Sequence, residues 1–151
     1  MAGPAPSLEQ RLDAIESRQA IADLVHRYAR HIRCDQPDMV AALFTAEGTF
    51  EIRDGDPDRS EYTVRSRYDG REDIHAHMSA NQGKPHPLPL LHNHIITVDG
   101  DAASGNAVME AGIYGGTHKI IGEYLDTYRR LGGEWLFAAR IYTIFGGASS
   151  L

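Results

Sequence analysis

Two histidines separated by one residue, in the segment His92-Asn93-His94, are the strongest chemical feature of the sequence. Side chains alternate along a β-strand, so His92 and His94 are predicted to share a face with Ile96 and Val98. Imidazoles on an apolar face, directly after a proline-rich loop, predict the rim of a pocket in which histidine acts as general acid or base. In the alternative interpretation, His94 is a hydrogen-bonded core residue and His92 is exposed.

The same pair raises the question of a metal ion, because imidazole is the commonest metal ligand in proteins. Glu110, on the next predicted strand, is a possible third ligand. Two ligands in register do not make a site, and no other His or Cys has a defined spacing to them. We therefore predict no metal and no cofactor. The remaining histidines are predicted to be surface or loop residues without a role: His26, His31, His75, His77, His86 and His118.

A second group of candidate residues closes the first predicted helix. Tyr28 continues the apolar stripe of that helix, so its hydroxyl needs a partner or a ligand. Arg33 and Asp35 follow at the helix end, from where they could point into a cavity. Arg30 and His31 are expected to be solvated there, because cations interact favourably with the dipole at a helix C-terminus.

Arg140 lies in the middle of the last predicted strand, among apolar and aromatic residues. A buried arginine is costly unless a carboxylate or an anionic ligand pairs with it. Asp35 is a candidate partner, and the pair would be either a structural ion pair or part of a catalytic site. Tyr142, on the same face as Arg140, is predicted to line the pocket, together with Tyr62.

The predicted elements place helices before strands. Ser7 and Gln10 form a capping-box pattern at the start of a helix of about 25 residues. Its apolar stripe consists of Leu8, Leu12, Ile15, Ile21, Leu24, Val25, Tyr28 and Ile32. Pro37 is predicted to begin a second helix, and residues 70–80 a third. Strands are predicted over 49–53, 62–68, 91–98, 104–114, 119–130 and 134–145, with turns at 54–60. Residues 82–89 are predicted to be a loop, because their prolines cannot hold a ladder. Helices followed by antiparallel strands indicate an α+β fold.

The last predicted strand is apolar on both faces, with Phe137 and Ile141 on one and Ala138 and Ile144 on the other. A half-exposed strand would alternate apolar with polar residues. Both faces are therefore expected to be covered, one by the helices and the other by a second subunit. This interpretation predicts a homo-oligomer, a dimer or higher, joined through the outer face of the sheet.

Composition excludes several classes of protein. The 151 residues, with hydrophobic residues at 42% and a single cysteine, suggest one domain over residues 8–146, with tails at 1–7 and 147–151. A net charge of −6 without a run of Lys or Arg argues against nucleic-acid binding. No apolar stretch approaches the ~20 residues that cross a membrane. The first residues lack the basic start and apolar run of a signal peptide, so a cytoplasmic location is expected.

The order of these elements resembles the SnoaL-like family of the nuclear-transport-factor-2-like superfamily. The residues that carry the resemblance are Arg27-Tyr28-Ala29-Arg30, Ala41-Ala42-Leu43-Phe44, Tyr68-x-Gly70-x-x-x-Ile74, Asn93-x-x-Ile96-x-Val98-Asp99-Gly100-Asp101 and Gly133-x-Trp135. The resemblance implies N-terminal helices packed on a strongly curved antiparallel β-sheet, as a cone with one central pocket. Relatives include scytalone dehydratase, bile-acid 7α-dehydratase and polyketide cyclases, which implies cofactor-independent eliminations, isomerisations and ring closures.

The resemblance does not transfer the usual His–Asp dyad of the dehydratases. Their Asp falls five residues after the helix tyrosine, where this sequence has Arg33, and their His falls four residues before the strand asparagine, where it has Pro89. Tyr28 matches, and Arg140 matches an arginine of the dehydrochlorinase-like relatives. Either Asp35 and a nearby histidine have replaced the dyad, or the pocket only binds a ligand.

The sequence thus predicts a cofactor-independent lyase or isomerase acting on a small aromatic, polyketide-like or steroid-like molecule. The alternative is a non-catalytic protein of the same fold that binds a small ligand. The predicted catalytic residues are Tyr28, Asp35, His92 and Arg140, with His92 as general acid or base and Asp35 orienting it. The predicted substrate-binding residues are Arg33, Tyr62, Asn93, His94 and Tyr142. A small molecule is the expected partner, without nucleic acid or membrane.

Overall fold

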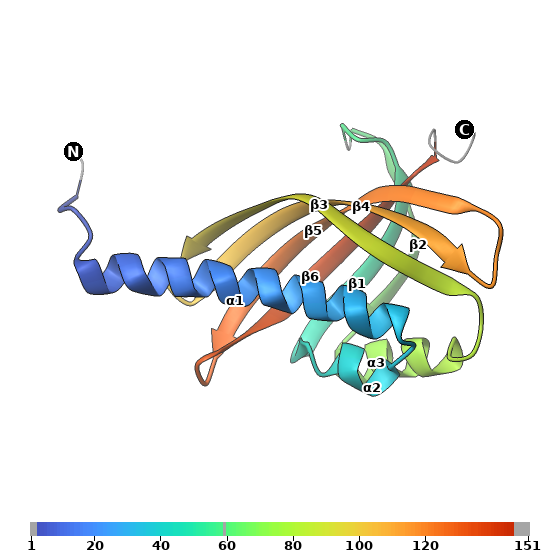
Figure 1. Cartoon of the computed structure of the whole chain (residues 1–151), viewed down its shortest axis with the longest axis horizontal. Coiled ribbons are helices and arrows are strands. Elements are labelled where there is room, and N and C mark those ends of the chain that lie inside the picture. Colours follow the sequence, from blue (N-terminus) through green and yellow to red (C-terminus); the bar gives the residue numbers. More distant parts are fainter. Residues whose placement is uncertain (1–2, 59, 147–151) are drawn as a thin grey trace.

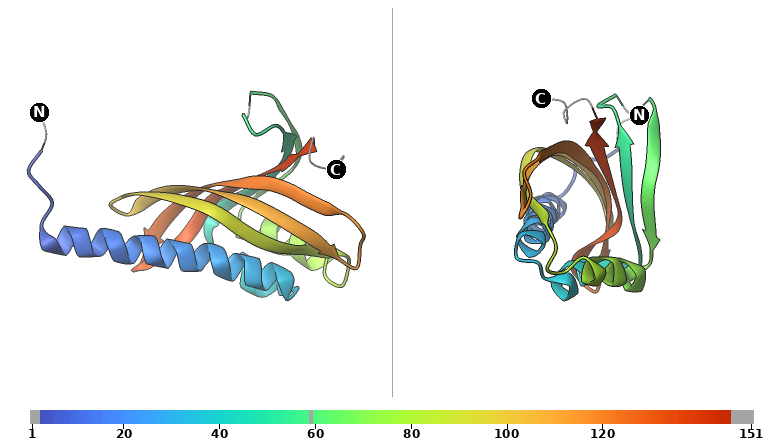
Figure 2. Two further views of the ribbon diagram at one scale, coloured as in Figure 1. Left: turned by 45° about the horizontal axis from the view of Figure 1, so that its top comes forward. Right: turned by 90° about the vertical axis from the view of Figure 1, so that its right-hand side faces the viewer.

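A six-stranded sheet curls around one long helix, and two shorter helices cover the lower end of the curl (Figures 1 and 2). The computed structural model describes residues 3–58 and 60–146; Arg59 in the predicted turn, residues 1–2 of the N-terminal tail and the C-terminal tail 147–151 lie outside them. The elements are α1 (Leu8–Arg33), α2 (Pro37–Ala41), β1 (Phe44–Gly55), β2 (Tyr62–Asp69), α3 (Arg71–Ala80), β3 (His86–Asp99), β4 (Ala102–Tyr114), β5 (Lys119–Leu131) and β6 (Glu134–Phe145). No helix in the described ranges is both long and apolar enough to cross a membrane.

The first helix, α1, begins at the predicted capping box. Ser7 Oγ accepts a hydrogen bond from the Gln10 backbone N–H at 3.1 Å, and Gln10 Oε1 accepts one from the Ser7 N–H at 2.8 Å. The predicted apolar stripe is only partly correct, because Leu8, Leu12 and Ile15 are 79%, 53% and 64% exposed. The first turns of α1 extend beyond the edge of the sheet, so only the later part of the stripe packs against it (Figure 1).

The strands follow the order β2-β1-β6-β5-β4-β3, and the sheet is mixed. The α+β fold class and the packing of helices on a curved sheet are confirmed, but β1 pairs with β6 in parallel, whereas the expected sheet was wholly antiparallel. Strands joined by a short turn must run antiparallel. No turn fixes the relative direction of β1 and β6, which are far apart in the sequence.

Strand β3 begins at His86, inside the segment predicted to be a loop. Pro87 pairs with Ile113 and Pro89 with Ala111. The prediction was wrong because β3 is an edge strand and has no neighbouring strand on its outer side. A proline on that side therefore removes no hydrogen bond from the sheet.

Strand β6 contains a bulge that the sequence prediction did not include. Phe137 pairs with Tyr128 and Ala139 with Thr127, so Ala138 is the extra residue. The bulge brings Phe137 and Arg140 to the same inner face, although simple alternation places them on opposite faces. A second subunit on the outer face of the sheet stays a prediction.

Candidate functional site

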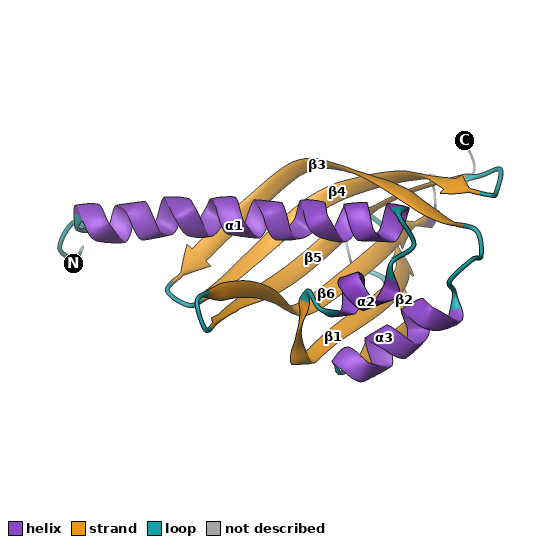
Figure 3. Ribbon diagram, turned by 60° about the horizontal axis from the view of Figure 1, so that its bottom comes forward, coloured by secondary structure: helices purple, strands orange, loops and turns teal. Residues whose placement is uncertain are grey.

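The candidate site is a mostly apolar pocket between the helices and the inner face of the sheet, with a volume of about 260 Å³. Figure 3 shows α2 and α3 beside the end of α1, and the loop from α3 to β3 passing that end. The apolar lining includes Ile32, Val40, Phe50, Ile52, Met78 and Ile120. The polar lining consists of Tyr28, His31, Asp35, Gln36, His77, Asn81, His86, Tyr124 and Tyr142. A few polar groups in an apolar cavity are typical of a small-molecule site.

Three tyrosines form one wall of the pocket, which we call the tyrosine wall: Tyr28 from α1, Tyr124 from β5 and Tyr142 from β6. Their ring centroids are 6.0 Å apart for Tyr28 and Tyr124 and 5.2 Å apart for Tyr124 and Tyr142. Burial raises the pKa of Tyr124 to about 12 and the pKa values of Tyr28 and Tyr142 further, so all three are proton donors at neutral pH. The buried hydroxyl of Tyr142 has no hydrogen-bond partner among residues 3–58 and 60–146.

Arg140 lies behind the tyrosine wall and does not line the pocket. Its guanidinium carbon is 3.5 Å from the ring centroid of Tyr124, 4.2 Å from that of Tyr28 and 4.5 Å from that of Phe137. The expected partner, Asp35, was wrong. A guanidinium stacked in this way is attracted to the electron-rich faces of the rings. Its positive charge also favours the ionised form of the phenol of Tyr124.

The partner of Arg140 is Asp126, the residue opposite it on β5. Arg140 Nε donates to Asp126 Oδ1 at 2.8 Å and Nη2 donates to Oδ2 at 3.1 Å, and both side chains are fully buried. The Tyr128 hydroxyl donates to Asp126 Oδ2 at 2.9 Å, and His94 Nε2 lies 3.4 Å from that hydroxyl. Gly105 makes room for this arrangement, since a Cβ there would lie 2.6 Å from the Tyr128 oxygen. We call these four side chains the Arg140 network.

The two histidines of the His92-Asn93-His94 segment do not share a face. Asn93 has a φ of 52°, and the register of β3 against β4 shifts between His92 and Ile95, which is a β-bulge. His94 therefore points to the inner face, where burial lowers its pKa. His92 is 48% exposed on the outer face, with Nε2 3.6 Å from Glu110 Oε1. Neither histidine lines the pocket, nor does Asn93. Among residues 3–58 and 60–146, His92, His94 and Glu110 do not form a group that could hold a metal ion.

Three histidines that were predicted to lie on the surface line the pocket instead: His31, His77 and His86. His31 Nδ1 is 2.8 Å from Gln36 Oε1. Because a carbonyl oxygen only accepts, Nδ1 carries the hydrogen and Nε2 of the neutral ring keeps its lone pair. His31 follows Tyr28 by three residues, so the helical spacing places both on the same face. That spacing is the signal by which the sequence could have identified it.

The other two histidines are held by neighbouring groups. His77 stacks on Tyr68 with ring centroids 4.1 Å apart, and burial lowers its pKa. His86 Nδ1 is 3.0 Å from the Lys84 carbonyl oxygen, and Nε2 is 3.1 Å from the Arg33 carbonyl oxygen. These two contacts hold the ring between the end of α1 and the start of β3.

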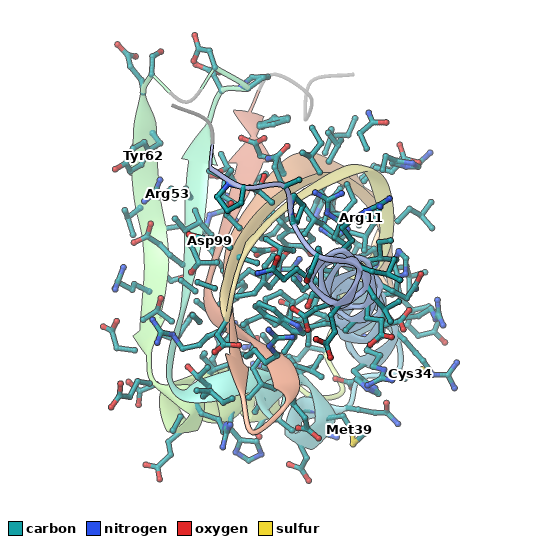
Figure 4. All side chains as sticks on the ribbon, turned by 90° about the vertical axis from the view of Figure 1, so that its left-hand side faces the viewer. Arg11, Cys34, Met39, Arg53, Tyr62 and Asp99 are labelled. Carbon is teal, nitrogen blue, oxygen red and sulfur yellow. The ribbon has the colours of Figure 1, made fainter. Side chains whose placement is uncertain are left out.

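The remaining predicted site residues are divided between the pocket and its surroundings. Asp35 lines the pocket, with a φ of 55° and with its Oδ2 accepting the Gly83 N–H at 2.7 Å. Arg33 is exposed and lines a neighbouring cavity. Tyr62 is 50% exposed on β2, with Arg53 above its ring, on the outer side of the sheet (Figure 4). Tyr28, Asp35 and Tyr142 are thus brought together, and His92 and Tyr62 are far from them.

A mixed, curled sheet with N-terminal helices packed on its inner face, and a pocket between the two layers, defines an α+β class of protein. The chain belongs to the SnoaL-like domain family, whose model matches residues 13–141. No functionally curated protein matches the chain at a significant level.

Several solved structures are similar to this one. A proposed scytalone dehydratase from Novosphingobium aromaticivorans is 21% identical, with a TM-score of 0.69, over 87% of this chain and 85% of that one. A type 2 hexachlorocyclohexane dehydrochlorinase is 18% identical, with a TM-score of 0.71, over 89% of this chain and 88% of that one. The β subunit of a proposed aromatic-ring-hydroxylating dioxygenase from N. aromaticivorans is 19% identical, with a TM-score of 0.72, over 87% of this chain and 91% of that one. Identities this low establish the fold alone.

Proposed function

We propose that the protein is a cofactor-independent lyase or isomerase acting on a small aromatic, polyketide-like or steroid-like molecule that carries a carbonyl or hydroxyl group. The observation that carries this proposal is the buried hydroxyl of Tyr142, which has no partner in the described part of the chain and belongs to a side chain that lines the pocket. Leaving a buried hydroxyl without a hydrogen bond costs about 1–3 kcal/mol. A substrate oxygen placed against the tyrosine wall would satisfy it.

The tyrosine wall suits an oxygen that gains negative charge during the reaction. Hydroxyl donors fixed in a dry cavity stabilise a developing enolate or phenolate more strongly than water does. The Arg140 guanidinium, stacked behind Tyr124 and Tyr28, adds positive charge on the far side of the rings. Arg140 acts on the substrate through these phenols and is a positioning residue in this scheme.

His31 takes the role of general base that the sequence prediction gave to His92. Its Nδ1–H is bound to Gln36 Oε1, so Nε2 is free to accept a proton from a substrate carbon. The imidazolium then returns this proton, either to a different carbon in an isomerisation or to the departing oxygen in a dehydration. Asp35 also lines the pocket, and its negative charge would stabilise that imidazolium.

A non-catalytic ligand-binding protein is the second candidate. The observation that favours it is the absence of the dehydratase dyad from its usual positions: Pro89 is part of the edge strand β3, and Arg33 is exposed. Structural similarity also extends to proteins of unknown function, including one from Mycobacterium tuberculosis with a TM-score of 0.69 at 22% identity over 85% of this chain and 76% of that one.

The test has a binding step and a turnover step. Phenolic, steroid and polyketide-like compounds are screened by thermal shift on the wild type, on Tyr142→Phe, and on Tyr62→Phe as the matched control outside the pocket. Compounds that bind are then incubated with the wild type, His31→Ala and His92→Ala, and products are identified by mass spectrometry.

Different outcomes separate the two functions. Catalysis predicts a product, a loss of about 10²–10⁴-fold in rate for His31→Ala, and no change for His92→Ala. A ligand that stabilises the wild type but is never converted indicates a binding protein. A rate that falls for His92→Ala and not for His31→Ala would overturn the assignment of the base.

A further inference from the structure

A second cavity, which we call the vestibule, adjoins the pocket at the C-terminal end of α1. It has a volume of about 690 Å³ and shares Asp35, Pro85 and His86 with the pocket lining. Its own lining adds the basic side chains of Arg33 and Lys84. An apolar chamber with a tyrosine wall therefore meets an outer chamber that carries two cations at Asp35, Pro85 and His86.

Neither cation of the vestibule is used by the fold. Within residues 3–58 and 60–146, Arg33 and Lys84 take part in no ion pair, whereas Arg130 and Arg140 each bind carboxylates. The one carboxylate in the lining belongs to Asp35, and its Oδ2 already accepts the Gly83 N–H at 2.7 Å.

Basic residues at a helix C-terminus often serve the helix itself, because they neutralise its last carbonyl oxygens. In α1 these oxygens have other donors. The carbonyl oxygens of Arg30, His31, Ile32 and Arg33 accept hydrogen bonds from Cys34 N, Gln36 N, Asp35 N and His86 Nε2, at 2.9, 3.0, 3.1 and 3.1 Å respectively. The side chains of Arg33 and Lys84 therefore remain available to a ligand.

The charge of the vestibule lining is opposite in sign to that of the whole chain. The net charge of the chain is −6, whereas the vestibule has the cations Arg33 and Lys84 against the single carboxylate of Asp35. A cationic opening on an anionic protein concentrates anions there by electrostatic attraction.

We infer that the ligand of this pocket carries a carboxylate, which binds Arg33 and Lys84 in the vestibule while the apolar body and its oxygen lie against the tyrosine wall. This inference rests on the proposed function only for the position of the apolar body. It narrows the substrate class to aromatic, polyketide-like or steroid-like acids.

The test compares two probes that differ only in the carboxylate, 2-naphthol and 6-hydroxy-2-naphthoate. Their dissociation constants are measured by isothermal titration at low and high salt, with the wild type, with Arg33→Gln combined with Lys84→Gln, and with Arg18→Gln, which removes an exposed cation elsewhere on α1. We expect the wild type and Arg18→Gln to bind the naphthoate about fivefold to tenfold tighter than the naphthol. The double variant should bind both equally, and salt should weaken the preference in the wild type.

A preference for the naphthoate that survives in the double variant would overturn the inference, as would a wild type that prefers the naphthol or binds neither probe. Failure of the proposed function has a different signature, because binding is measured without turnover. A preference that Arg33 and Lys84 control, in a protein that converts no compound, supports the inference and rejects catalysis. Turnover of neutral compounds without a preference for acids supports catalysis and rejects the inference of a carboxylate ligand.

Discussion

Two groups of buried polar side chains occupy the inner face of the same sheet, and they differ in how their polar atoms are satisfied. In the Arg140 network, Asp126 receives two hydrogen bonds from the guanidinium and one from Tyr128, which leaves Nη1 of Arg140 without an acceptor in the described part of the chain. Among the residues that line the pocket, Tyr142 has a buried hydroxyl without a partner in those same residues, and His31 Nε2 keeps a free lone pair. The hydrogen bonds of the network stabilise the fold, whereas an unpartnered polar group on a side chain that lines the pocket is available to a ligand.

The largest expected effect is the loss of the buried ion pair. Asp126→Asn removes the charge opposite Arg140, whose side chain is fully buried, and should lower the free energy of unfolding by about 3–5 kcal/mol. Asp101→Asn is a matched control, because Asp101 also accepts from an arginine Nε, that of Arg130, at 2.8 Å, but is 76% exposed. The control should cost less than about 1 kcal/mol. Urea unfolding of both variants measures the difference.

Equal losses in the two variants would show that the burial of the Arg140 network does not matter to stability, and the contrast with the pocket would fail. Combining Asp126→Asn with Arg140→Met distinguishes an uncompensated charge from a general packing defect. The double variant should recover part of the stability, because it no longer buries an unpaired guanidinium.

The same chemical change should have opposite consequences in the two regions. Tyr128→Phe removes the hydrogen bond to the Asp126 carboxylate and should cost about 1.5–3 kcal/mol of stability. Tyr142→Phe removes a hydroxyl without a partner, so stability should stay the same or rise. Ligand affinity should fall for Tyr142→Phe and stay near the wild-type value for Tyr128→Phe. Thermal unfolding with and without a ligand from the screen measures both quantities, and a large loss of stability in Tyr142→Phe would contradict the assignment.

Much of the fold could be predicted from the sequence, because local signals determine it. The capping box at Ser7, the proline at the start of α2 and the strands predicted over 62–68, 104–114 and 119–130 each correspond to an element that the structure contains. The exceptions depend on tertiary position. Leu8 and Leu12 have the helical spacing of core residues, but α1 extends past the sheet at that point.

The candidate site was less predictable, because single bulged residues reverse the inward and outward faces of a strand. The bulge at Asn93 turns His92 outward, and the bulge at Ala138 brings Phe137 and Arg140 to one face. Periodicity also did not identify Asp126 as the partner of Arg140, because that pairing depends on the register between β5 and β6.

The bulge in β3 can be tested through the left-handed backbone at Asn93. Asparagine tolerates a φ of 52°, glycine tolerates it fully, and a β-branched residue does not. Asn93→Gly should leave stability nearly unchanged, and Asn93→Val should lower it by about 1 kcal/mol. Denaturant unfolding of the pair measures this. If valine is tolerated as well as glycine, β3 does not hold this conformation, and the separation of His92 from His94 would need revision.

The smallest expected effect is a pH dependence that arises at His77 in the pocket. Burial lowers the pKa of His77 in the folded protein below the value of about 6.5 in an unfolded chain. Between those two values the unfolded state binds more protons, so the contribution to stability is complete above about pH 6.5 and is lost as the pH falls through the folded value. His77→Phe keeps a ring stacked on Tyr68 and removes the titration. The free energy of unfolding of this variant should therefore fall less than that of the wild type between pH 7 and pH 5, as measured by urea unfolding at each pH. An identical decline in both proteins would mean that the imidazole is as well solvated in the pocket as in the unfolded chain.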